Sequence, residues 1–95
     1  MLTADEQSLF RPVFEELKGT TKARILDESN QLLKEVKVKD IVSEIERTKN
    51  PKSIVLDGVI TKRLVDAAEK AGAKYVIGAR KGKIEQNEKV KAATL

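Results

Sequence analysis

The most regular apolar pattern in the chain lies between residues 53 and 79. An apolar run at residues 54–56 is followed by a segment in which apolar residues recur at helical spacing until Gly72, and then by a second apolar run at residues 75–77. Two parallel strands need a crossover of about a dozen residues, which is usually a helix. The pattern therefore predicts a strand, a right-handed crossover helix and a parallel strand. The expected strand bounds are residues 53–57 and 73–78.

The N-terminal half alternates between helical and strand patterns. Thr3 and Glu6 match the capping box that begins many helices, and an apolar helical stripe follows them to Leu17. Pro12 lies inside this stripe, so we expect either one helix over residues 4–18 that bends near Pro12 or a helix broken into two pieces. The other expected elements are a β-hairpin with strands at residues 20–26 and 31–36, and a helix at residues 38–48.

Beyond residue 82 the apolar residues become sparse. Val90, Ala92 and Thr94 alternate weakly, so residues 83–95 form either a tail or a short edge strand. We expect residues 1–82 to form a single domain, because a chain of 95 residues is typical of one domain. The predicted fold class is α/β, with a small mixed sheet of four strands, or five with the edge strand. It contains a β-hairpin, a right-handed βαβ unit and three helices.

The composition excludes several classes of active site. The chain contains no cysteine and no histidine, which removes thiol nucleophiles, disulfides, imidazole bases and the common zinc ligands. We therefore expect no catalytic residues, no metal site and no cofactor in this chain. No apolar run approaches the roughly 20 residues that span a bilayer, and the first residues lack a secretory pattern. A cytoplasmic protein without membrane contact is expected.

Asp57 is the one carboxylate for which a functional role is considered. It ends a buried strand, the position where open α/β sheets place ligands, and Gly58 permits close approach. The alternative is structural, in which the carboxylate accepts hydrogen bonds from N–H groups of the turn before the helix at Thr61. Val59 and Ile60 in this turn are expected to cap the sheet edge, and they become candidate protein contacts if they prove exposed.

A basic cluster follows the second parallel strand. Arg80, Lys81 and Lys83 lie at this strand end, in a chain of net charge +4. Such a cluster can contact phosphate groups, although it is also typical of a solvated terminus. The chain has few aromatic side chains, and single-strand binders usually need them for stacking. Direct RNA or DNA binding through this cluster and the tail remains an alternative.

Several segments within residues 8–82 together resemble the C-terminal domain of archaeal DnaG, the bacterial-type primase homologue of archaea. The most specific of them runs through the predicted βαβ unit and contains Asp57 and Arg63. The matching segments are Phe14-Glu-Glu-Leu-Lys-Gly-Thr20, Lys22-Ala-Arg-Ile-Leu-Asp27, Val38-Lys-Asp-Ile-Val42, Val55-Leu-Asp-Gly-Val-Ile-Thr-Lys-Arg-Leu-Val-Asp66 and Lys74-Tyr-Val-Ile-Gly-Ala-Arg80.

The resemblance implies a non-catalytic domain of a longer protein. In that family a separate Toprim-type domain carries the metal-binding carboxylates for nucleotidyl transfer, and this chain lacks its glutamate and Asp-x-Asp pattern. Mg²⁺ is therefore implied only for the catalytic domain. The resemblance also implies docking onto the archaeal RNA exosome through the cap subunit that carries a zinc ribbon. RNA would then be bound mainly by other parts of the longer protein.

No family motif assigns the docking residues, and Val59, Ile60 and Arg63 are the candidates for a protein interface. Two other functions stay open beside docking. One is an RNA- or DNA-binding accessory domain that uses the basic strand end and tail. The other is a degenerate Toprim-like enzyme that uses Asp57.

Overall fold

The apolar run at the centre of the sequence forms the central strand of a five-stranded sheet in the computed structural model, which describes residues 2–95. All four residues of this strand are buried. The helices are α1 (Ala4–Leu17), α2 (Ile41–Glu46) and α3 (Lys62–Lys70), with a 3₁₀ turn η1 (Val38–Asp40) before α2. The strands are β1 (Lys22–Leu26), β2 (Leu32–Lys37), β3 (Ser53–Leu56), β4 (Val59–Ile60), β5 (Tyr75–Gly78), β6 (Arg80–Lys81) and β7 (Lys91–Thr94).

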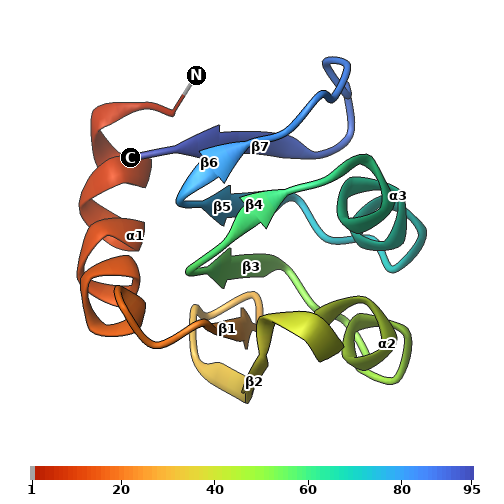
Figure 1. Cartoon of the computed structure of the whole chain (residues 1–95), viewed down its shortest axis with the longest axis horizontal. Coiled ribbons are helices and arrows are strands. Elements are labelled where there is room, and N and C mark those ends of the chain that lie inside the picture. Colours follow the sequence, from red (N-terminus) through yellow and green to blue (C-terminus); the bar gives the residue numbers. More distant parts are fainter. Residues whose placement is uncertain (1) are drawn as a thin grey trace.

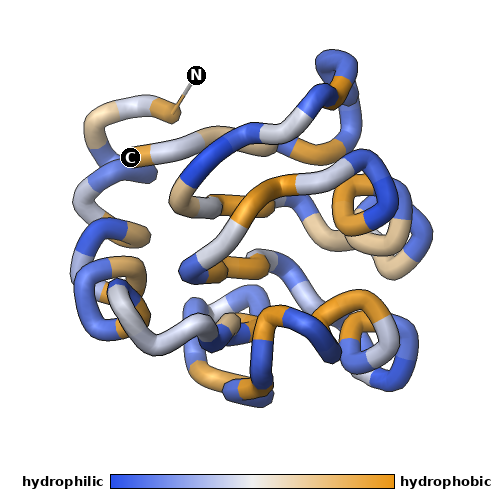
Figure 2. Tube along the Cα trace, viewed as in Figure 1, coloured by the Kyte–Doolittle hydropathy of each residue, from blue (hydrophilic) through white to orange (hydrophobic). Residues whose placement is uncertain are grey.

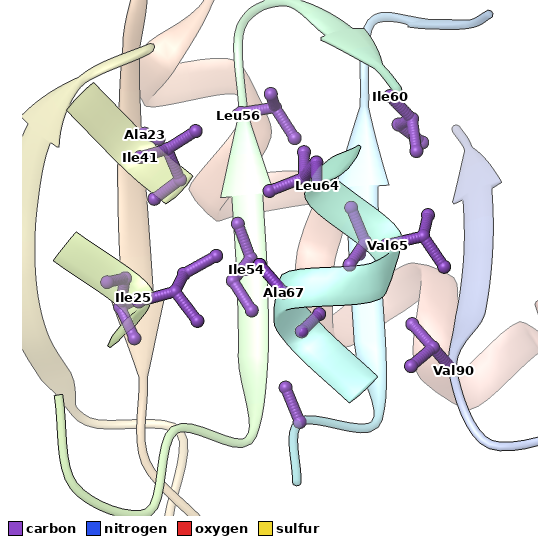
Figure 3. Close-up of a cluster of buried hydrophobic side chains, with 14 residues drawn as sticks. Ala23, Ile25, Ile41, Ile54, Leu56, Ile60, Leu64, Val65, Ala67 and Val90 are labelled. Carbon is purple, nitrogen blue, oxygen red and sulfur yellow. The ribbon is translucent and has the colours of Figure 1, made fainter. Parts of the chain in front are cut away.

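The five-stranded sheet has the order β2-β1-β3-β5-β7. β1 pairs antiparallel with β2 and β3, whereas β5 pairs parallel with β3 and β7. Figure 3 shows α3 in front of the sheet with β5 to the right of β3, which makes the connection right-handed. The predicted mixed sheet, with its hairpin, βαβ unit and three helices, is confirmed.

Helices cover both faces of the sheet, and each face has its own apolar cluster (Figures 1 and 2). Side chains alternate along a strand, so Ile54 and Leu56 of β3 face α2 and α3, whereas Val55 faces α1. Leu64 of α3 belongs to the first cluster (Figure 3), and Phe10 of α1 to the second. Each fully buried side chain of this size contributes about 1.5–3 kcal/mol to stability.

α1 begins at the predicted capping box. The Thr3 hydroxyl oxygen accepts a hydrogen bond from the Glu6 N–H at 3.1 Å, and the Glu6 carboxylate accepts one from the Thr3 N–H at 2.9 Å. The helix is continuous through Pro12, so the alternative of two pieces is not adopted. Because Ser8 and Pro12 are both exposed, water can solvate the Ser8 carbonyl that lacks an intrahelical partner.

The structure departs from the sequence-based expectations in two places and decides between two alternatives in a third. The helix expected over residues 38–48 begins as the 3₁₀ turn η1, where no side chain caps the first N–H groups, and α2 ends at Glu46. Residues 91–94 form β7, so of the two C-terminal alternatives the edge strand is the one adopted. Val59–Ile60, expected as a cap of the sheet edge, forms β4 and pairs in parallel with β6.

Glu6 joins the first helix to the last strand. Its carboxylate accepts hydrogen bonds from the Tyr75 hydroxyl and, at 2.9 Å, from the Lys91 ammonium group. The Phe10 ring packs against Tyr75, with the ring centroids 5.1 Å apart. The hydrogen bond from Tyr75, followed by those from Thr3 and Lys91, lowers the pKa of Glu6 from 4.5 to about 2.

This contact predicts a loss of stability in acid. A carboxyl group whose pKa is lower in the folded than in the unfolded chain stabilises the fold above its unfolded pKa, and that contribution is lost as the pH falls through the folded pKa. For Glu6 this contribution to stability is lost as the pH falls from 4.5 to about 2. Urea unfolding should therefore show that Glu6→Gln is less stable than the native chain at neutral pH, and that the difference shrinks in acid. A difference that stays constant with pH would contradict this assignment.

A second prediction concerns the close approach between β5 and β4. A methyl group on Gly78 would lie 2.6 Å from Ile60 Cγ1 and 3.0 Å from the Gly58 carbonyl oxygen. Gly78→Ala should therefore destabilise the fold by about 1–3 kcal/mol, as overpacked cores do. Gly72→Ala is unsuitable as a control because Gly72 has a φ of 82°. The control is Ala79→Ser, an exposed neighbour, and equal stability of the two variants in urea would rule out the contact.

Candidate interaction surfaces

The carboxyl ends of β3 and β5 carry a second, two-stranded sheet. The chain leaves β3 and forms β4 after a short turn, and it leaves β5 and forms β6 in the same way. β4 and β6 pair in parallel. The register places Val59 opposite Arg80 and Ile60 opposite Lys81. Gly82 then donates its N–H to the Ile60 carbonyl at 2.9 Å. The structure thereby brings the turn after β3 and the basic cluster after β5 to one surface.

The six residues singled out for an interface or for nucleic-acid contact differ in exposure. Ile60 is fully buried in the cluster beneath α3, so the exposure required of it as a protein contact is not met. Val59 is half-buried. The exposed residues are Arg63, in the first turn of α3, and the three of the basic cluster, Arg80, Lys81 and Lys83.

Asp57 fastens the connection between α1 and β1. Its Oδ2 accepts hydrogen bonds from the N–H groups of Gly19, at 3.0 Å, and Thr21, at 2.9 Å. The structural interpretation named the turn before Thr61 as the donor, and this was wrong because the hydrogen bonds come from a loop about 36 residues earlier. Thr21 has a φ of 55°, a left-handed conformation that costs a non-glycine residue about 1–2 kcal/mol. The two hydrogen bonds offset that cost.

No cluster of metal ligands accompanies Asp57. Among residues 2–95 there is no group of three or more Asp, Glu, His or Cys side chains placed to hold a metal ion. The same part of the chain contains no helix both long and apolar enough to span a bilayer.

Two lysines missed by the sequence analysis extend the basic surface. Lys37 ends β2 and Lys39 lies in η1, and both are exposed. Between them, Val38 packs on the turn after β3, where a methyl group on Gly58 would lie 3.0 Å from Val38 Cγ1. No local pattern relates these lysines to Gly58, because the contact depends on the order of the strands in the sheet.

The outer edge of the sheet at β2 exposes apolar side chains. Leu32 and Leu33 are 55% and 40% exposed, and the only other exposed large apolar residue among those described is Leu9. The pairing register shifts by one residue beside them, and Leu33 is the extra residue. The extra residue interrupts the regular alternation of side chains, so the strand pattern does not assign both leucines to a face, and both are exposed.

Ion pairs hold the same strand to its neighbours. The Arg24 guanidinium donates a hydrogen bond to Glu35 at 2.8 Å, which lowers the pKa of Glu35 below its ordinary value. Lys34 lies 3.0 Å from Glu44 of α2. These contacts fix the centre of β2. The side chains of Leu32 and Leu33 stay exposed, and the outward backbone groups of this edge strand have no neighbouring strand.

The role of Asp57 generates a prediction. Asp57→Ala should lower the free energy of unfolding by about 1–2 kcal/mol, because it leaves two backbone N–H groups without their acceptor. Asp57→Asn keeps an acceptor oxygen and should lose less. Urea unfolding measures both values, and equal stability of the native chain and Asp57→Ala would show that the two hydrogen bonds contribute nothing.

Comparison with known proteins places the chain among archaeal relatives that are named DNA primase DnaG. The relative from Methanothermobacter thermautotrophicus is 43% identical over 83 residues, which is 86% of this chain and 22% of the relative. Those from Methanosarcina barkeri and Thermofilum pendens are 46% identical over 80 residues and 47% identical over 70 residues. These matches cover 83% and 74% of this chain, and 16% of each relative.

The similarity covers most of this chain but only a short part of each relative. No family model and no solved structure matches this chain. The chain spans 15–22% of the length of the relatives it matches. The residues that carried the sequence resemblance lie within the fold described above, and the resemblance is confirmed. The chain belongs to the archaeal DnaG family and corresponds to a small part of its much longer members.

Proposed function

We propose that this chain is a non-catalytic protein-interaction domain at the C-terminal end of a longer DnaG protein. In this proposal it docks that protein onto the archaeal RNA exosome by binding the cap subunit with the zinc ribbon. RNA contacts and the Mg²⁺ of nucleotidyl transfer would belong mainly to other domains of the longer protein. The compartment would be the cytoplasm, with no membrane contact.

The chemistry of the chain supports a role in binding rather than in catalysis. The relatives are named as primases, yet the chain matches 22% or less of their length. Its sequence has no cysteine or histidine. Asp57, the candidate for a degenerate Toprim-like enzyme, uses its carboxylate to hold the loop at Gly19 and Thr21. That alternative therefore has the least support.

The single observation that carries docking is the open apolar edge at β2. An edge strand presents unpaired backbone N–H and C=O groups, and an extended segment of a partner can add to the sheet there. Leu32 and Leu33 lie at this edge and are the most exposed large apolar side chains of residues 2–95. The occupant that fits them is an extended segment of the cap subunit that carries apolar residues.

Calorimetric titration of the chain with the purified cap subunit tests the proposal. Binding is expected, and Leu33→Asp or Leu32→Asp should weaken it about tenfold or more, the loss that follows from about 1.4 kcal/mol at an apolar contact. No heat and no co-elution at tens of micromolar would refute docking itself.

Leu9→Asp provides the matched control. Leu9 is 39% exposed, close to the 40% of Leu33, but it lies on α1 rather than at the sheet edge. This variant should bind the cap subunit as the native chain does. If Leu9→Asp weakens binding while both β2 variants leave it unchanged, docking holds but its surface lies on the α1 side.

A further inference from the structure

Exposed cations from separate segments of the chain lie at the carboxyl end of β3 and β5. Lys22 lies opposite Lys37 in the β1–β2 pair. Beyond them Val38 packs against Gly58. The Gly58 carbonyl accepts hydrogen bonds from the N–H groups of Ala79, at 2.9 Å, and Arg80, at 3.4 Å. Four separated segments of the chain therefore meet at this end. We call the exposed cations along this line the basic track: Lys37, Lys39, Arg80, Lys81 and Lys83.

Carboxylates lie near the basic track, since Glu35 and Asp40 line the same hollow as Lys37 and Lys39, but its cations are not held in direct ion pairs among the described residues. None of its five members has an ion pair within 4.0 Å to any of residues 2–95, whereas the adjacent Lys62 is 2.9 Å from Asp66. The Asp57 carboxylate lies beside the track, but it is bound to backbone N–H groups. Unpaired cations at the surface gain by contact with a partner that carries repeated negative charge.

The dimensions of the track suit an extended polyanion. Its two ends lie on β2 and on the extension of β5, three strand intervals apart in the sheet order. At about 4.8 Å per interval, the track is roughly 14 Å long. This length suits a few consecutive phosphate groups better than one isolated anion.

We propose that the basic track binds the phosphate backbone of single-stranded nucleic acid. A protein partner is disfavoured here, because protein interfaces depend on large apolar anchors and the exposed leucines lie elsewhere, on α1 and at the start of β2. The three aromatic residues belong to the cluster beneath α1. The track therefore contacts phosphates without stacking bases, and its binding does not discriminate between sequences or between RNA and DNA.

This activity is separate from docking. Leu32 and Lys37 lie at opposite ends of β2, about 16 Å apart at 3.3 Å per residue. The nucleic-acid proposal and the docking proposal can therefore fail or hold independently. They predict that the chain carries nucleic acid and a protein partner at the same time.

Fluorescence anisotropy with a labelled uridine dodecamer tests the track. If three phosphates are contacted, the logarithm of the affinity falls with the logarithm of the salt concentration with a slope of about −2, and a fourfold rise in salt weakens binding about 20-fold. The double variants Lys37→Glu/Lys39→Glu and Arg80→Glu/Lys81→Glu should each weaken binding about tenfold or more at low salt. The corresponding thymidine dodecamer should bind equally well.

The control is Lys70→Glu/Lys74→Glu, which makes the same change in net charge at the other end of the sheet, where both lysines are exposed. It should bind the dodecamer nearly as tightly as the native chain, and circular dichroism should show all variants folded. An equal loss in the control, salt-insensitive binding, or no binding at low salt would overturn the proposal. Preferential binding of a glutamate-rich peptide over the dodecamer would overturn it as well.

Discussion

Burial of β3 on both faces is the constraint on which the fold depends. Side chains alternate along its four residues, so no single helical layer can cover it. α1 must lie on one face and α2 with α3 on the other, and β1 and β5 must occupy both edges of the strand. The two apolar clusters, the mixed pairing and the position of Asp57 at one end of the sheet all follow from this arrangement.

The close packing beyond β3 has a different origin. β4 lies against β5 because Gly78 leaves room for Ile60, and Val38 reaches the turn after β3 because Gly58 has no side chain. Both contacts bring the basic segments around Lys37 and Arg80 close to the turn after β3, and burial of apolar side chains alone would not do so. Polar backbone groups complete the arrangement, since the Gly58 carbonyl accepts from Ala79 and Arg80. The charged surface is thus a product of steric fit within the core.

The sequence predicted the elements whose patterns are local. The capping box at Thr3, the first hairpin strand β1 and the apolar run of β3 each depend on neighbouring residues, and each was confirmed. The β4–β6 pair, the donors to Asp57 and the approach of Lys37 to the basic cluster depend on contacts between distant segments. Propensity carries no information on such contacts, so the candidate site could be named only in part, and Ile60 proved buried.

The contact between Glu6 and Lys91 places the two ends of the chain at one corner of the molecule. Leu2 and Leu95 belong to the same apolar cluster, beside β7 (Figure 1). β2 lies at the opposite edge of the sheet. Any covalent connection at either terminus would therefore leave from the side remote from Leu32 and Leu33. Such a tether would leave the β2 edge directed away from the point of attachment and sterically accessible.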